Sequence, residues 1–330
     1  MARRPPATEG ERMRAIWLRE FGGPEVLVPG PAPDPVPGPG QVLIDVAHVN
    51  ITFVETQLRS GRPGPFRVTP PLIPGNGVGG VITAVGADVD SALTGRRVVS
   101  ATGGSGGYAE RAVVDASAPF EVPAGLALDD AVALLADGRT ATLLVDAAGV
   151  RPGDRVLVEA AAGGVGSLLV QLAARAGAQV VGVAGGARKV DLLPGLGADL
   201  AADYRLPGWA DQVRDAVGGV DVVFDGVGGP IARTAFELLD PGGRMVSFGL
   251  ASGGWSPVSA EDAAARHVTL VRSDVPPARM RAYTDQVLAG AAAGQLRTLI
   301  GQRFPLERAA DAHAAIEARA TVGKTLLDVN

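Results

Sequence analysis

The amino-acid sequence predicts an α/β protein of two domains, one rich in β-strands and one built on a doubly wound parallel sheet. A chain of 330 residues is long enough for two domains that each bury a core. Short β-branched runs, separated by proline and glycine clusters, fill the first third of the chain. From about residue 131, apolar strands alternate with helical stretches, which predicts βαβ units and a parallel sheet.

The β-rich part runs from Met13 to about Val122. Its apolar runs lie at 42–46, 78–82, 98–99 and 112–114. Proline and glycine clusters at 29–40 and 61–74 separate them, which is typical of a small antiparallel barrel or sandwich. Residues 1–12 carry no such pattern, and we expect a disordered leader there.

The second part predicts strands at 156–158, 180–184, 220–224, 245–248 and 268–271, with helices at 168–176, 189–196 and 231–239. Two more helices, 277–293 and 306–319, and a last strand at 325–329 close the chain. We expect this tail to return to the first domain. The predicted domains are therefore 13–122 together with 274–330, and 123–273.

Composition excludes several kinds of protein. The chain has 30 Lys and Arg against 35 Asp and Glu, scattered along its length, so no basic surface for nucleic acid or membrane is predicted. The absence of cysteine excludes disulfides, thiolate catalysis and cysteine-bound zinc. His48, His267 and His313 lie in separate regions, and no metal site is predicted. No signal peptide or membrane span is visible, and we expect a cytoplasmic protein.

The most informative segment is RVLVEAAAGGVGS at 155–167. Ala161, Gly163 and Gly166 form A-x-G-x-x-G, a relative of the dinucleotide fingerprint, between a strand and a helix. Small residues there permit a tight turn and the close approach of a pyrophosphate to the amides of the helix N-terminus. Alone, the motif also suits an ordinary β–α turn. Its strand–loop–helix context favours a dinucleotide site.

The residues after the second strand indicate which dinucleotide is bound. An NAD site usually carries an acidic residue there for the ribose hydroxyls, but none occurs between Gln179 and Val190. Arg188 and Lys189 stand at this place and suit a 2′-phosphate, so NADPH is favoured. The alternative is that both cations simply begin a solvated helix.

Eight segments in order resemble one known family: MRAI at 13–16, FGGPEVL at 21–27, ETQLRSG at 55–61, IPG at 73–75, GGYAE at 106–110, RPGDRVLV at 151–158, AAGGVG at 161–166 and GAD at 197–199. The chain resembles the zinc-free quinone oxidoreductases, the zeta-crystallin-like branch of the medium-chain dehydrogenase/reductase superfamily, over 13–330. The resemblance implies a GroES-like catalytic domain around a Rossmann domain. It also implies NADPH, no zinc, a homodimer, and hydride transfer to quinones or α,β-unsaturated carbonyls.

The resemblance also implies cofactor contacts. Carried over residue by residue, they are Thr140, Gly163, Gly164, Val165, Gly166, Gly185, Lys189, Tyr204, Phe248, Gly249 and Arg319. Lys189, Tyr204 and Arg319 would surround the 2′-phosphate, together with Arg188. For Tyr204 and Phe248, packing within the fold is the alternative.

The expected catalytic residues lie where the chain departs from the family. Thr52 stands where the family usually has the asparagine of its Asn-x-x-Asp or Asn-x-x-Glu segment, and Asn50 lies two residues earlier. Thr52, Asn50 and Glu55 are the candidates for polarising and protonating an enolate, with solvent as the alternative proton source. Thr52 is preferred, since its hydroxyl retains a hydrogen-bond donor. The aromatic residues that many members place near the substrate are absent.

We therefore expect an NADPH-dependent reductase of quinones or enones, acting in a cleft between its domains by transfer of a hydride or of single electrons. Two alternatives remain. One is a biosynthetic tailoring enzyme, an enoyl-type reductase of a polyketide-like enone or acyl thioester. The other is a non-catalytic NADPH-binding sensor. A homodimer is expected, because the apolar strand at 268–271 would otherwise leave an unpaired sheet edge.

Overall fold

The computed structural model describes residues 12–62, 67–272 and 275–329. The expected leader at 1–12 lies outside the described residues except for Arg12, which begins the first strand. The chain forms two compact units. The first unit is Met1–Ala136 with Ile300–Asn330, and the second unit is Asp137–Leu299. Helix α2 (Leu128–Ala148) crosses the boundary between them.

The boundaries differ from the expected ones at 122/123 and 273/274, the latter falling on residues outside the described part. Helix α9 (Pro277–Ala292) belongs to the second unit and not to the first. The Tyr283 hydroxyl donates a hydrogen bond of 2.5 Å to Asp146 in α2, and Arg279 pairs with the same carboxylate at 2.6 Å. These contacts hold α9 against the second unit, which the order of elements alone does not show.

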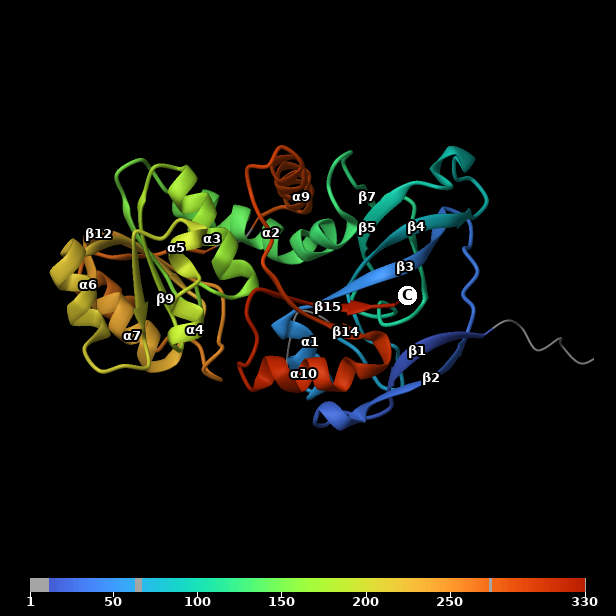
Figure 1. Cartoon of the computed structure of the whole chain (residues 1–330), viewed down its shortest axis with the longest axis horizontal. Coiled ribbons are helices and arrows are strands. Elements are labelled where there is room, and N and C mark those ends of the chain that lie inside the picture. Colours follow the sequence, from blue (N-terminus) through green and yellow to red (C-terminus); the bar gives the residue numbers. More distant parts are fainter. Residues whose placement is uncertain (1–11, 63–66, 273–274, 330) are drawn as a thin grey trace, which may run out of the picture. The chain divides into compact units, whose positions relative to one another are not determined.

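The first unit contains two sheets. Strands β1 (Arg12–Leu18) and β2 (Leu27–Pro33) form an antiparallel pair. The larger sheet has the order β14-β15-β3-β4-β5-β7, with β6 also paired to β3. Its strands are β3 (Gln41–Ile51), β4 (Gly77–Val85), β5 (Arg97–Ala101), β6 (Arg111–Asp115), β7 (Phe120–Glu121), β14 (Ile300–Pro305) and β15 (Lys324–Asp328). Strand β15 runs antiparallel beside β3, with Leu326 opposite Asn50, which confirms the return of the tail (Figure 1).

Two helices complete the first unit beside short 3-10 turns (Pro24–Val26, Ser91–Leu93 and Leu306–Arg308). Helix α1 (Phe53–Arg59) follows β3, and α10 (Ala309–Glu317) follows β14. The sheet alternates, so Val42, Ile44 and Val46 of β3 are buried in one core, which Ala309 and Ala312 of α10 also enter.

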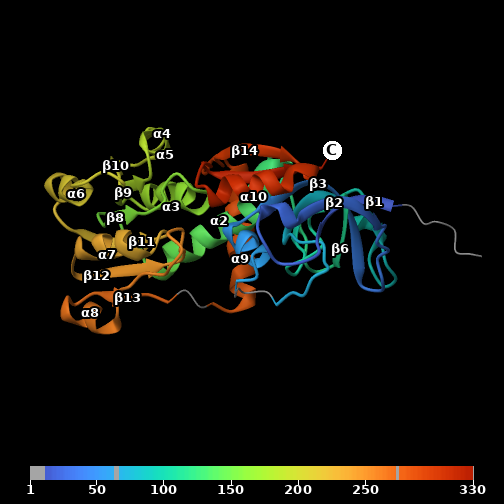
Figure 2. The ribbon, with the colours of Figure 1, turned by 90° about the horizontal axis from the view of Figure 1, so that it is seen from below.

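The second unit is built on six parallel strands in the order β10-β9-β8-β11-β12-β13, which Figure 2 shows in sequence across the sheet. They are β8 (Arg155–Val158), β9 (Gln179–Ala184), β10 (Leu200–Asp203), β11 (Val220–Asp225), β12 (Leu239–Ser247) and β13 (Thr269–Leu270). The order runs outward in opposite directions from β8 and β11. This is the doubly wound Rossmann arrangement, as the alternating pattern predicted.

The remaining helices of the second unit are α3 (Gly164–Arg175), α4 (Ala187–Val190), α5 (Leu193–Leu196), α6 (Trp209–Val217), α7 (Gly229–Glu237) and α8 (Ala260–Ala265). The expected helix at 189–196 is wrong as one element. Pro194 in the first turn of α5 lacks an N–H and blocks continuation of a helix from α4. Sequence reasoning also missed β10 and α6. No helix in the described ranges is long and apolar enough to cross a membrane.

Candidate functional site

Four loops meet at the carboxyl ends of neighbouring strands in the second unit. They follow β8, β9, β11 and β12, and the direction of the strand order reverses between β8 and β11. Open α/β sheets bind ligands at such a switch point. Three of the loops carry predicted cofactor glycines, which are Gly163, Gly164 and Gly166, Gly185, and Gly249. The loop after β11 carries Gly226 and Gly228, which the sequence analysis did not single out.

The loop after β8 turns tightly. The Gly163 N–H donates to the carbonyl of Ala160 at 2.8 Å, and the Ala161 N–H donates to Val183 of β9 at 3.1 Å. A Cβ at Gly166 would collide with the Ala160 carbonyl, so this position needs glycine. The loop therefore has the close packing of helix on strand that the glycine motif predicted.

Helix α3 begins directly in this loop, with Gly163 as its extended N-cap (φ −85°, ψ 177°). The first-turn amides of a helix have no acceptor within it, and its dipole favours an anion there. Gly163, Gly164 and Val165 are partly exposed, whereas Gly166 is buried. This geometry suits a pyrophosphate on the amides of α3.

The loop after β9 brings Gly185 and Tyr204 together. A Cβ at Gly185 would lie 3.0 Å from the Tyr204 ring, and the Tyr204 N–H donates to the carbonyl of Ala184 at 3.1 Å. Arg188 is exposed and Lys189 is half-buried on the short helix α4 that follows. Arg188, Lys189 and Tyr204, three of the four residues predicted around a 2′-phosphate, thus lie on this loop and at the end of the neighbouring strand β10.

Arg205 is a cation at this loop that sequence reasoning missed. Its guanidinium lies so close to Gly186 that a Cβ there would collide with it. Asp203, at the end of β10, pairs with Arg205 at 3.4 Å. Burial acts to raise the pKa of Asp203, but hydrogen bonds from the amides of Arg205 and Gly186 outweigh it and lower that pKa. The sequence signal for Arg205 is its place just after a strand, but the hydrophobic pattern did not reveal that strand, β10.

The loop after β12 is tied to β11. The amides of Phe248 and Gly249 donate to the carbonyl of Asp225 at 2.8 and 3.3 Å. A Cβ at Gly226 would lie 2.7 Å from the Phe248 ring, so the two loops are in direct contact. Phe248 is partly exposed beside this contact.

Two predicted cofactor residues are placed elsewhere. Thr140 is half-buried on α2. Arg319 is exposed just after α10 in the first unit, with a positive φ of 53°. Their contact with a cofactor stays a prediction.

In the first unit, Thr52 and Glu55 form a hydrogen-bonded pair at the start of α1. The Thr52 N–H donates to Glu55 Oε2 at 2.7 Å, and the Thr52 hydroxyl is hydrogen-bonded to the same oxygen. The Asn76 N–H donates to Glu55 Oε1 at 3.3 Å. This is the reciprocal capping of a helix by threonine and glutamate.

Glu55 has the environment of a carboxyl group with a raised pKa. Its side chain is buried, with 4% exposure, whereas Thr52 is half-buried. Burial raises the pKa of Glu55 against the opposing effects of the Thr52 hydrogen bonds and the positive charge of Lys324. The pair therefore joins a buried carboxyl group to a more accessible hydroxyl.

The side chain of Asn50, the third candidate, is buried and hydrogen-bonded within the first unit. It is 1% exposed on β3, and its Nδ2 donates to the carbonyl of Val132 in α2 at 3.4 Å. The side chain also fills the space that Gly77 leaves. This burial argues against contact with a substrate, and the reason was invisible in sequence because it depends on the neighbouring strand.

A buried network lies behind α1. The Tyr108 hydroxyl and His313 Nε2 are 2.8 Å apart, and both side chains are fully buried. Burial, with a further effect of the positive charge of Arg59, lowers the pKa of His313 to about 3. Arg59 is itself 1% exposed and pairs with Glu317. Sequence reasoning missed this network, although Tyr108 lies in the GGYAE segment.

Two of the three histidines are bonded to other side chains of the first unit. His48 Nδ1 is bonded to Asp328 Oδ1 at 2.8 Å, and His313 is committed to Tyr108. Across the described ranges, no three His, Cys, Asp or Glu side chains gather in a group that could hold a metal.

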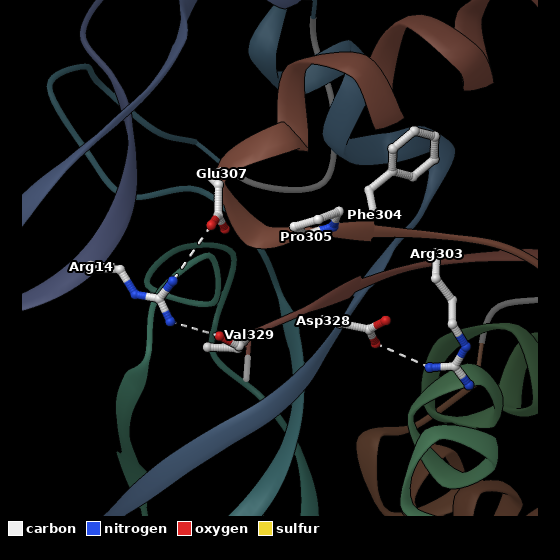
Figure 3. Close-up of a pocket in the computed structure, with 7 residues that line it drawn as sticks. All are labelled: Arg14, Arg303, Phe304, Pro305, Glu307, Asp328 and Val329. Carbon is white, nitrogen blue, oxygen red and sulfur yellow. Dashed lines mark hydrogen bonds and ion pairs between the residues drawn. The ribbon is translucent and has the colours of Figure 1, made fainter.

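A hollow of about 340 Å³ lies in the first unit (Figure 3). It is lined by Arg14, Arg303, Phe304, Pro305, Glu307, Asp328 and Val329. Arg14 donates to the Val329 carbonyl at 2.9 Å, and Arg303 pairs with Asp328 at 3.0 Å. The lining includes neither Thr52 nor Glu55, and its charges are paired among themselves, which indicates a structural role.

A Rossmann unit with a glycine loop at its switch point, carried on one chain with a β-rich unit, defines the class of dinucleotide-dependent oxidoreductases of the medium-chain type. Comparison with family models agrees. Residues 38–124 match the alcohol dehydrogenase GroES-like domain, and residues 196–327 match the zinc-binding dehydrogenase model.

Individual proteins are similar over nearly the whole chain. A 2-haloacrylate reductase of Burkholderia is 32% identical over 331 residues, covering 95% of this chain and 98% of that protein. Human quinone oxidoreductase is 33% identical over 331 residues, covering 97% and 99%. The structure of Escherichia coli quinone oxidoreductase complexed with NADPH has a TM-score of 0.87 at 28% identity, covering 96% and 100%. The chain belongs to the quinone oxidoreductase branch of the medium-chain dehydrogenase/reductase superfamily and is an oxidoreductase, which confirms the resemblance.

Proposed function

We propose that this protein is an NADPH-dependent reductase that delivers a hydride to a quinone or to an alkene conjugated with a carbonyl. The glycine loop at the switch point carries the proposal, since it presents the first-turn amides of α3 to a pyrophosphate. Bound NADPH supplies the hydride. The family relationship and the NADPH complex of the E. coli enzyme support this assignment.

The preference for the phosphorylated cofactor rests on charge. Arg188, Lys189 and Arg205 lie on or beside the Gly185–Gly186 loop, and no acidic residue ends β9. A guanidinium or ammonium group forms charge-assisted hydrogen bonds with a phosphate. Asp203, an acid beside this loop at the end of β10, is already engaged by Arg205 and by the Gly186 amide.

Thr52 and Glu55 are proposed as the proton donor. Hydride addition to the β-carbon of an enone leaves an enolate, whose oxygen needs a proton. The Thr52 hydroxyl gives its proton to that oxygen while Glu55 gives its carboxyl proton to Thr52 Oγ1. The carboxylate left on Glu55 then takes a proton from solvent, which restores the pair. The direct Thr52–Glu55 hydrogen bond and the burial of Glu55 support this path.

We further propose that turnover needs no zinc. The chain has no cysteine, and two of its three histidines are bonded within the fold. These residues give no set of three converging ligands, the usual number in a catalytic zinc site.

A carboxylate-bearing acrylate is a second candidate substrate, favoured by Arg139. This side chain is half-buried on α2 next to Thr140, and its Nε has no hydrogen-bond partner among the described residues. Burial lowers the pKa of Arg139, and no acidic side chain opposes that effect. Such a guanidinium suits a substrate carboxylate, as an acrylate carries. The similarity to a 2-haloacrylate reductase points the same way.

The test is NADPH oxidation with a panel of quinones, neutral enones and 2-haloacrylates. Thr52→Val should lower kcat for enones about 100-fold, since removing one donor to a developing oxyanion typically costs 10²–10³. NADPH affinity should stay constant, and Thr52→Ser, which keeps the hydroxyl, should retain activity. Arg139→Met should raise KM for acrylates alone. A protein inert with the whole panel would refute the proposed function.

A further inference from the structure

Two carboxyl groups are buried side by side at the switch point, and the function proposed above uses neither. Glu159 directly follows β8, and Asp225 ends β11. The two strands are neighbours, with Val158 opposite Phe224, so Glu159 and Asp225 are the next residues along the pair. Both side chains are fully buried.

Hydrogen bonds within the fold reach one carboxyl oxygen of Glu159 and one of Asp225. The Val227 N–H lies between Glu159 Oε2 and Asp225 Oδ1, at 3.1 Å from each. The Gly228 N–H donates to Asp225 Oδ1 at 2.7 Å. Glu159 Oε1 and Asp225 Oδ2 are buried without a hydrogen-bond partner among the described residues. A single proton between these two oxygens would satisfy both.

Two adjacent carboxylates cannot both carry charge in such surroundings. Burial first, and then the charge of Asp225 and a hydrogen bond with it, raises the pKa of Glu159 well above its ordinary value.

Within the described ranges, no ion pair joins a cation to Glu159 or Asp225. The loops at 160–166, 226–229 and 247–249 and strand β9 contain no charged side chain. The cations that the structure describes on the packed elements have other partners or lie far along them. Arg155 at the start of β8 is bonded to Asp221 and Asp240, and Arg244 within β12 is bonded to Asp154. Arg233 within α7 pairs with Glu237 and Asp262, and Arg175 is the last residue of α3.

Glu159 and Asp225 are joined, by chain connection or by hydrogen bonds, to three of the loops at the candidate cofactor site. Glu159 leads into the glycine loop through Ala160, whose φ of 47° begins the turn. The side chains of both acids hold the amides of the turn after β11. The backbone carbonyl of Asp225 accepts the amides of Phe248 and Gly249. A change at the pair therefore reaches all three loops.

We propose that Glu159 and Asp225 share one proton and that this proton holds the three loops in the arrangement that binds the dinucleotide, which makes Glu159 a positioning residue for the cofactor. The proposal rests on the proposed binding of NADPH. When the proton is lost in alkaline solution, the two carboxylates repel each other. The turn after β11 then separates from the glycine loop, and the cofactor binds less tightly.

The experiment measures the Kd for NADPH by fluorescence titration across the neutral and alkaline range. For the wild type, Kd should rise about tenfold for each pH unit above the pKa of the pair, as linkage to one proton requires. Glu159→Gln keeps a neutral hydrogen-bonding side chain. Its Kd for NADPH should no longer rise with pH through ionisation of the Glu159–Asp225 pair. Asp225→Asn is a second variant with the same expected result. Asp211→Asn, an exposed carboxylate on α6, is the matched control and should keep the wild-type profile.

Infrared spectroscopy gives an independent measure. The difference spectrum of wild type minus Glu159→Gln at neutral pH should contain the C=O band of a protonated, buried carboxyl group. An identical pH profile in wild type and both variants, or the absence of this band, would overturn the proposal. A protein that binds no NADPH at any pH would instead refute the proposed function, while the infrared result would still show whether the pair holds a proton.

Discussion

In acid, the buried His313 should lower the free energy of unfolding of the first unit. Replacing His313 by glutamine should remove this loss. In the folded protein, burial lowers the pKa of this imidazole from 6.5 to about 3. Between these values the unfolded chain binds a proton that the folded chain does not, so the free energy of unfolding falls as the pH falls. At about 1.4 kcal/mol for each pH unit, the loss reaches about 2 kcal/mol by about pH 5 and about 5 kcal/mol by about pH 3.

The assay is urea unfolding at several pH values, with Trp17 as the fluorescent reporter of the first unit in a background where Trp209 and Trp255 are replaced by phenylalanine. Since all other groups titrate in both proteins, the difference in unfolding free energy between wild type and His313→Gln isolates the imidazole. That difference should change by about 2 kcal/mol between about pH 7 and about pH 5.

Tyr108→Phe is the matched control for the hydrogen bond itself. It removes the partner at 2.8 Å but keeps the buried histidine. It should cost about 1–3 kcal/mol at neutral pH, because a buried ring nitrogen loses its partner, and should retain the acid dependence. A wild-type minus His313→Gln difference that is flat with pH would refute the reasoning.

Lys189→Ala should raise the Kd for NADPH about tenfold or more and leave NADH binding almost unchanged, since one charge-assisted bond is worth about 1.5–3 kcal/mol. Equal weakening of both cofactors would show that Lys189 supports the fold instead. Prolonged chelation should leave turnover intact, and a chelated enzyme rescued by zinc would contradict the zinc-free proposal. Ala160→Gly should raise the free energy of unfolding by about 1 kcal/mol, because the φ of 47° strains a residue with a Cβ. A destabilised variant in the same urea assay would show that the Cβ packs favourably. Leu270→Lys, at the edge strand β13 where Leu270 is 39% exposed, should turn the proposed homodimer into a monomer in sedimentation velocity. The control Leu206→Lys changes an exposed leucine away from that strand and should leave the dimer intact. A dimer that persists in Leu270→Lys would place the interface elsewhere.

The sequence alone determined the features that depend on local pattern. Apolar runs alternating with helical stretches predicted the doubly wound sheet, because each strand buried on both faces must be nearly all apolar. The small residues of the segment 161–166 predicted the turn into α3, since only small side chains permit that close packing. The last apolar strand after the α/β part predicted that the tail returns to the first domain, where β15 pairs with β3.

Only the tertiary structure decided which residues far apart in sequence bury, contact or hydrogen-bond one another. The burial of Asn50 depends on Gly77 and Val132, and the membership of α9 depends on its bonds to α2. Arg205 joined the cofactor loop only because β10 lies beside β9. Glu159 and Asp225 are 66 positions apart, yet the parallel register of β8 and β11 sets the two carboxyl groups side by side in the buried interior of the second unit.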